Sequence, residues 1–275
     1  MHVLSEADQQ FWKKNGYVIV HNAVPQENLD AVVDEIWNFL QIDRNNPAEW
    51  YNPPVRKTGM VELYQHQVLW NNRQHPRIYG AFADLWNNDK LWVSLDRANM
   101  NPPDRPGWDY TGFVHWDIDS TVKPRPFWMQ GVLYLTDTTA DQGGFQCIPG
   151  FHRQLDEWEK TQPPDRDPRR GDFTGYEVKP IPGKAGDLLI WHSLLPHGNG
   201  RNLTNRPRLA QYITMSPARA DNETERQERI KSWQERLPPK GFPGDPRGLE
   251  QKNGKTAELT ALGRKLLGLD SWGDQ

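Results

Sequence analysis

Apolar residues near the start of the chain recur with a helical period. Ser5, with Asp8 three positions later, is a near match to a capping box and predicts a helix that ends at Gly16. The run 17–20 is short and β-rich. Pro25 then opens a second helix. The apolar face of that helix is expected to contain Leu29, Val32, Val33, Ile36, Trp37 and Leu40.

The segment 44–76 has no regular period and is rich in Asn, Pro, Gln and Trp. Loops of this length are uncommon unless they serve a function. We therefore expect residues 55–75 to form a lid over a pocket, and a third helix to follow at about 76–86. The polar and aromatic residues of the expected lid are Met60, Glu62, Gln65, His66, Gln67 and Trp70.

From Leu91 the pattern changes to short β-rich runs separated by Pro, Gly and Asp clusters. Regularly spaced short strands predict a sandwich or barrel. A polar insertion at 156–175 interrupts them, and helices are predicted again after Pro217, at about 222–236 and 256–267. The expected strands are 91–99, 111–118, 127–136, 143–148, 176–181, 186–192 and 208–216.

The fold class predicted by this order is mostly β with flanking helices. The 275 residues fit one domain. We expect residues 1–90 to supply helical support and the lid, residues 91–217 to form the β core, and residues 218–275 to form a helical extension.

Composition narrows the function classes. A formal net charge of −3 gives no reason to expect nucleic acid or an anionic membrane as partner. The single cysteine, Cys147, excludes an intrachain disulfide and argues against a Cys-based zinc site. No secretory signal and no membrane-spanning run is visible, so we expect a cytoplasmic monomer or homodimer that acts on a small molecule.

His115 and Asp117 are two positions apart in a segment expected to be a strand. Residues at i and i+2 of a strand project from the same face, so an imidazole and a carboxylate can reach one point. The pair alone is more typical of a surface strand with two polar positions.

The apolar run 188–191 leads into two histidines, His192 and His197, and glycines follow at 198 and 200. A histidine beside glycines at a strand end can lie at a barrel mouth with open space next to it. Combined with His115 and Asp117, it would complete a set of two histidines and one carboxylate, which suits iron(II).

Arg208 begins the next expected strand. A guanidinium there can bind the far carboxylate of a 2-oxo acid in a bidentate manner. Taken alone, Arg208 could equally form an exposed salt bridge.

Together these segments resemble the phytanoyl-CoA dioxygenase family of iron(II)- and 2-oxoglutarate-dependent oxygenases. The resemblance rests on HWD at 115–117, GGFQCIPGFHR at 143–153, GDLLIWHSLLPHGNGRN at 186–202, and Arg208, 11 positions after His197. FWKKNGYVIVHNAV and LTALGRKLLGLDSW, near the two ends, also resemble family segments.

The resemblance implies a double-stranded β-helix, the cupin-like jelly roll. It implies that His115, Asp117 and His197 bind iron(II), that Arg208 binds the C5 carboxylate of 2-oxoglutarate, and that His192 packs structurally. Asn99 and Asn199 stand where relatives contact the cosubstrate.

The implied reaction is an O2-dependent hydroxylation of a small-molecule C–H bond, with release of succinate and CO2. Related halogenases have a small residue in place of Asp117. The residues expected to line the substrate pocket are Trp116, Trp128, Gln130, Tyr134, Gln65 and Gln67.

Two other function classes fit parts of the sequence. A cupin-like metal-dependent isomerase or hydrolase would use a similar site without 2-oxoglutarate, and it would not need Arg208. A non-catalytic small-molecule-binding barrel would typically lack one ligand, whereas none is missing here.

Overall fold

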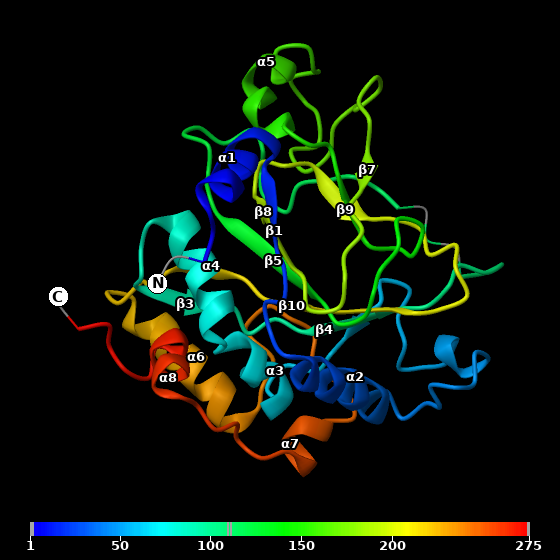
Figure 1. The fold of residues 1–275 in the computed structure, drawn as a ribbon, viewed down its shortest axis with the longest axis vertical. Coiled ribbons are helices and arrows are strands. Elements are labelled where there is room, and N and C mark those ends of the chain that lie inside the picture. Colours follow the sequence, from blue (N-terminus) through cyan, green and yellow to red (C-terminus); the bar gives the residue numbers. More distant parts are fainter. Residues whose placement is uncertain (1–2, 109, 111, 274–275) are drawn as a thin grey trace.

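The β-rich runs assemble into two antiparallel sheets and a two-stranded ribbon (Figure 1). The computed structural model describes residues 3–108, 110 and 112–273. The large sheet has the strand order β1-β8-β5-β10-β4-β2, and the small sheet has the order β7-β6-β9. The strands are β1 (Tyr17–Val20), β2 (Met60–Val61), β3 (Leu91–Val93), β4 (Ala98–Asn101), β5 (Met129–Tyr134), β6 (Phe145–Cys147), β7 (Lys179–Pro180), β8 (Leu188–His192), β9 (His197–Asn199), β10 (Arg208–Tyr212) and β11 (Met215–Pro217).

Strand β8 shows how the layers are arranged. Leu188 and Ile190 belong to the main apolar core, whereas Leu189 and Trp191 belong to a second cluster that contains Phe145 of the small sheet. Successive residues of a strand face opposite sides, so the large sheet is covered on both faces. This explains why the run 188–191 is apolar throughout. The mostly β fold with a jelly-roll core is confirmed.

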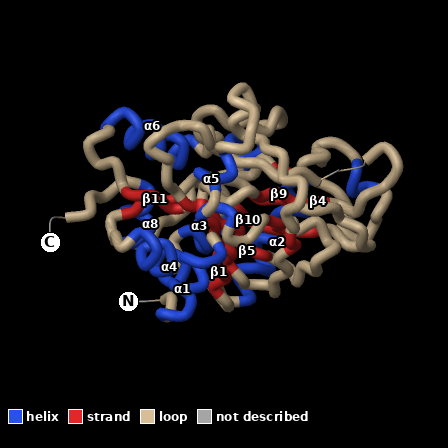
Figure 2. Tube along the Cα trace, turned by 90° about the horizontal axis from the view of Figure 1, so that it is seen from above, coloured by secondary structure: helices blue, strands red, loops and turns tan. Residues whose placement is uncertain are grey.

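Helices cover one face of the large sheet. Figure 2 shows most of them at one side of the strands, with long loops at the opposite side. No helix among the described residues is long and apolar enough to cross a membrane. The helices are α1 (Glu6–Asn15), α2 (Gln26–Leu40), α3 (Gln67–Arg73), α4 (Pro76–Trp86), α5 (Leu155–Glu159), α6 (Glu223–Glu235), α7 (Leu249–Asn253) and α8 (Ala261–Leu267), with 3-10 turns η1 (Glu49–Tyr51) and η2 (Phe151–Arg153).

Local signals at the N-terminus are confirmed. The Ser5 hydroxyl accepts the Asp8 N–H, and the Asp8 carboxylate accepts the Ser5 N–H, which completes the capping box of α1. Gly16 ends the helix with φ at +77°, a conformation that favours glycine. The division of the chain at residues 90 and 217 stays a prediction.

The prediction for residues 44–76 was wrong in part. The segment contains η1, β2 and α3 instead of one irregular loop. Trp70 of α3 is completely buried in the main core, and Gln65 just before it is also completely buried. Side chains that hold the core together cannot move as part of a lid. The lid expected at 55–75 is therefore wrong for Gln65 and Trp70.

Three expected strands also differ. The run 91–99 is divided between β3 and β4, and the run 208–216 between β10 and β11; β3 pairs with β11, and β4 pairs with β10. In 111–118, whose residue 111 lies outside the described residues, His115 forms an isolated bridge to His197. The partner strand β9 was not predicted, because the sequence His-Gly-Asn has no β-branched or aromatic residue to indicate a strand.

Candidate metal centre

His115 and His197 are held opposite each other by their own backbones. The His115 N–H donates to the His197 carbonyl at 2.9 Å, and the His197 N–H donates to the His115 carbonyl at 3.0 Å. His197 begins β9, so this bridge attaches the loop around residue 115 to the edge of the small sheet. Asp117, two residues later, projects to the same side.

One ligating atom from each of His115, Asp117 and His197 lies within 4.8 Å of the other two. The His115 Nε2 is 3.3 Å from Asp117 Oδ1, and the His197 Nε2 is 3.2 Å from Asp117 Oδ2. The arrangement offers two imidazole nitrogens and one carboxylate to a single point. Such a donor set fits iron(II) and leaves further positions open.

Neighbouring groups orient two of these side chains. The His197 Nδ1 lies 2.9 Å from the Leu195 carbonyl, so this nitrogen carries the proton and Nε2 is free to bind a metal. The Gln130 amide donates to Asp117 Oδ2 at 2.7 Å. Burial alone would raise the pKa of Asp117, but the His115 and His197 rings and the Gln130 amide, which lie against its oxygens, hold it well below its usual value. The carboxylate is therefore ionised.

His192 lies in a different environment. Its ring contacts the rings of Trp12, Phe127 and His152, and its Nδ1 accepts the Leu194 N–H at 3.0 Å. Burial, together with the nearby His152, lowers the pKa of His192 to about 3. The structure thus brings His197, and not His192, to His115 and Asp117.

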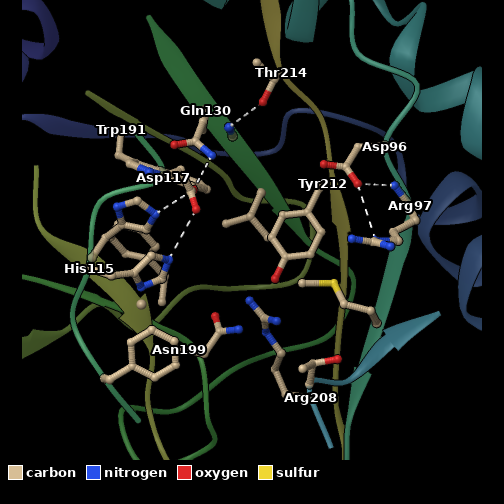
Figure 3. A pocket seen from close by; sticks show the side chains of 18 of the residues that line it. Asp96, Arg97, His115, Asp117, Gln130, Trp191, Asn199, Arg208, Tyr212 and Thr214 are labelled. Carbon is tan, nitrogen blue, oxygen red and sulfur yellow. Dashed lines mark hydrogen bonds and ion pairs between the residues drawn. The ribbon is translucent and has the colours of Figure 1, made fainter. Parts of the chain in front are cut away.

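The three side chains border a cavity of about 410 Å³ between the two sheets (Figure 3). Its wall includes Gln130 of β5, Trp191 of β8 and Tyr212 of β10 from the large sheet. The small sheet contributes residues of β6 and β9, including Asn199. Arg208 lies at one end of the same cavity.

Arg208 is completely buried, yet its guanidinium is only partly paired. One terminal nitrogen donates to Asn99 Oδ1 at 2.8 Å. Nε and the other terminal nitrogen are buried without a hydrogen-bond partner among the described residues. Unpaired buried donors on a charged group are costly, and a carboxylate that accepts from both would remove that cost. The site therefore fits a dicarboxylate that reaches the metal with its other end.

Comparison with known proteins assigns the chain to a family. The family model of phytanoyl-CoA dioxygenase (PhyH) matches residues 12–210, which include His115, Asp117, His197 and Arg208. The chain belongs to the phytanoyl-CoA dioxygenase family. It is therefore a 2-oxoglutarate-dependent non-haem iron dioxygenase, and the resemblance noted in the sequence is confirmed.

A curated relative and two solved structures are similar to this chain. Ectoine dioxygenase from Bordetella bronchiseptica is 23% identical over 230 residues, covering 75% of this chain and 74% of that protein. The structure of GlcNAc Inducible Gene 2 from Candida albicans has a TM-score of 0.74 at 14% identity and covers 99% of this chain and 78% of its own. The epimerase SnoN was solved with Fe3+, alpha ketoglutarate and nogalamycin RO. It has a TM-score of 0.55 at 18% identity, and the match covers 78% of this chain and 83% of that chain.

Of the six residues expected to line the substrate pocket of this family member, Gln130 does so. Trp116 faces the opposite side from His115 and Asp117, where its completely buried indole donates to the Leu194 carbonyl at 2.9 Å. Tyr134 is buried, and its hydroxyl donates to the Ile181 carbonyl at 2.7 Å. Trp128 is 41% exposed and does not border the cavity.

The two glutamines of the expected lid are also bound elsewhere. Gln65 donates to Ser232 Oγ at 2.9 Å, and Gln67 donates to the Glu258 carbonyl at 3.1 Å. Both contacts join the start of α3, or the residues just before it, to the C-terminal extension. Neither glutamine borders the cavity.

Several residues of the cavity wall were missed in the sequence, among them Asp96, Tyr212 and Phe242. Tyr212 could have been found, because it lies four residues after Arg208 and so faces the same side of β10. Phe242 belongs to a Pro/Gly-rich linker 34 positions after Arg208, and no local pattern connects it to the site.

Proposed function

We propose that this enzyme hydroxylates a C–H bond of a small molecule, consumes 2-oxoglutarate and O2, and releases succinate and CO2. In this proposal His115, Asp117 and His197 hold iron(II), and Arg208 binds the C5 carboxylate of 2-oxoglutarate. The observation that carries it is that a three-ligand cluster and an incompletely paired, buried guanidinium border one cavity.

When bound, the metal and the cosubstrate supply the oxidising chemistry. The protein positions the reactants and excludes water. Gln130 and the Leu195 carbonyl fix the orientation of two ligands, while Trp191 and Phe145 pack against the His197 ring and keep solvent from it. Asp117 fills the third ligand position, which supports hydroxylation over halogenation.

We further propose different roles for the two asparagines. Asn99 is completely buried and touches Arg208, so it would position the guanidinium without contacting the cosubstrate itself. Asn199 borders the cavity on the Arg208 side and can contact the cosubstrate directly (Figure 3).

Anaerobic titration with iron(II) and 2-oxoglutarate tests the proposal. The chelate should give a weak visible charge-transfer band in the wild type, and Arg208→Ala should need far more 2-oxoglutarate to produce it. Mass spectrometry of an incubated metabolite extract should then find a product with one added oxygen. A wild type without the band, or an Arg208→Ala enzyme with unchanged activity, would instead support a metal-dependent isomerase or hydrolase.

A further inference from the structure

The cavity has a second charged region, away from Arg208. Asp96 and Arg97, in the connection between β3 and β4, both border it. Figure 3 shows Asp96 and Asp117 on opposite sides of the cavity, with the ring of Tyr212 between them. The proposed metal and cosubstrate occupy the side of Asp117 and Arg208, so the side of Asp96 remains for the substrate.

Asp96 is held rigidly. The Arg97 N–H donates to Asp96 Oδ1 at 2.8 Å, and the guanidinium of Arg73 donates to the Asp96 carbonyl. The side chain is 28% exposed, and it borders the cavity. Within the described part of the chain, Oδ2 of Asp96 has no hydrogen bond. A fixed carboxylate therefore presents one free oxygen to the space in which a substrate would lie.

The guanidinium of Arg97, next to Asp96, is bound through one terminal nitrogen, and its Nε is buried without a hydrogen-bond partner among the described residues. Arg97 donates to Glu62 Oε2 at 2.9 Å and to the Tyr64 hydroxyl at 3.1 Å. Its Nε approaches Asp96 Oδ1 only to 3.7 Å, which is too long for a hydrogen bond. Glu62 is shared between Arg97 and Arg56, whose terminal nitrogen lies 3.0 Å from Glu62 Oε1. Arg97 therefore remains an ion-pair neighbour of Asp96 Oδ1, and Oδ2 is the carboxylate oxygen that accepts no hydrogen bond from the described residues.

The surroundings of Asp96 favour a cation. Burial raises the pKa of Asp96, which means that its charged form lacks the solvation it has in water. Binding of iron(II) and 2-oxoglutarate would not change the charge around Asp96. The charges of the metal and the cosubstrate balance each other, as do those of Asp117 and Arg208. Tyr110 and Tyr212 also border the cavity, and aromatic faces attract cations. Gln130 Oε1 adds a buried acceptor without a partner among the described residues.

We propose that Asp96 binds a protonated nitrogen of the substrate, and that the enzyme therefore acts on a small molecule with a basic amine. The amine would lie at Asp96 and the carbon to be oxidised would face His115, Asp117 and His197. This inference rests on the proposed function for the reaction, but the binding of the amine does not depend on iron.

Three probes of one shape test the proposal: cyclohexylamine, cyclohexanol and cyclohexanecarboxylate. Calorimetric titration is done under argon on the protein loaded with iron(II) and 2-oxoglutarate. The wild type should bind the amine about tenfold or more tightly than the alcohol, as expected for a hydrogen bond to a charged group. Asp96→Asn keeps an acceptor for the Arg97 N–H but removes the charge, so it should abolish the preference. Asp156→Asn, which removes a carboxylate from the surface, should retain it.

Equal affinity of the wild type for the amine and the alcohol would overturn the proposal. So would a preference for the carboxylate, which would place recognition at Arg97, and so would a preference for the amine that survives in Asp96→Asn. If Asp96→Asn does not fold, Asp96→Ser replaces it and should likewise lose the preference for the amine.

The two proposals fail separately. The titrations are repeated on metal-free Asp117→Asn protein, in which the amine cannot pair with residue 117. An absent charge-transfer band together with a retained amine preference would refute the iron site alone. A normal band without an amine preference would refute the role of Asp96 alone.

Discussion

Arg73 and Arg208 are both completely buried, but they lie on opposite sides of the large sheet. Arg73 belongs to α3 in the helical layer, and both of its terminal nitrogens donate to backbone carbonyls, those of Tyr64 and Asp96. Its Nε alone is buried without a partner among the described residues. Arg208 faces the cavity, and only one of its terminal nitrogens has a partner among the described residues.

The difference separates buried polar side chains that hold the fold together from those that face the cavity and can bind a ligand. On the helical side, Asn72 also donates to Gln211, and Gln211 donates to the Leu69 carbonyl, so polar side chains there join elements together. On the cavity side, Arg208, Trp191 and Gln130 each keep a buried donor or acceptor without a partner among the described residues. Groups of the first kind stabilise the fold, whereas groups of the second kind can bind a ligand in the cavity.

Removing a metal ligand should have the largest effect on the cavity side. We expect His197→Ala to weaken iron(II) binding at least about 100-fold, because loss of a direct ligand exceeds the loss of an outer contact. Iron content and the charge-transfer band measure it. His192→Asn is the matched control and should keep the band; if it loses the band as His197→Ala does, the assignment of the two histidines is wrong.

Exchanging the two arginines for methionine tests the comparison directly. Arg208→Met should weaken 2-oxoglutarate binding by about 3 kcal/mol or more, with no loss of stability, because it removes a poorly paired buried charge. Arg73→Met should lower the free energy of unfolding by about 3 kcal/mol, because two buried carbonyls lose their donor. Calorimetry and urea unfolding measure both. Equal loss of stability in the two variants would contradict the distinction.

His192 should make the protein sensitive to acid. Its pKa is lowered by burial to about 3 in the folded state, so the unfolded chain takes up a proton first as the pH falls below the ordinary value of 6.5. The free energy of unfolding should therefore fall on the order of 2 kcal/mol between pH 6.5 and 4.5. Urea unfolding across this range measures the slope. His192→Asn should flatten it; an unchanged slope would assign the acid sensitivity to other groups.

Asn99 should have the smallest effect. Asn99→Ala removes the hydrogen bond that orients Arg208, and we expect about tenfold weaker binding of 2-oxoglutarate. Titration of the charge-transfer band measures this. Asn72→Ala on the helical side is the control, since it should lower stability and leave the 2-oxoglutarate affinity unchanged. The reverse pattern would show that Asn99 serves the fold and not the site.

The sequence by itself determined the features that depend on neighbours along the chain. The capping box at Ser5, the apolar run 188–191 and the spacing of His115 and Asp117 are all visible within a few residues. The interval from His197 to Arg208 spans one turn between adjoining segments, so it too could be recognised before the structure was known. These signals were enough for the fold class and for the four residues of the proposed iron and cosubstrate sites.

Only the tertiary structure decided what lies inside the cavity and what lies in the core. Gln65 appeared suited to a lid, but its partner Ser232 is 167 positions away and holds it in the interior. Conversely, Asp96 and Phe242 reach the cavity from the β3–β4 connection and the C-terminal linker. A side chain's partners across the fold determine its burial, and the residues beside it in sequence carry no record of those partners.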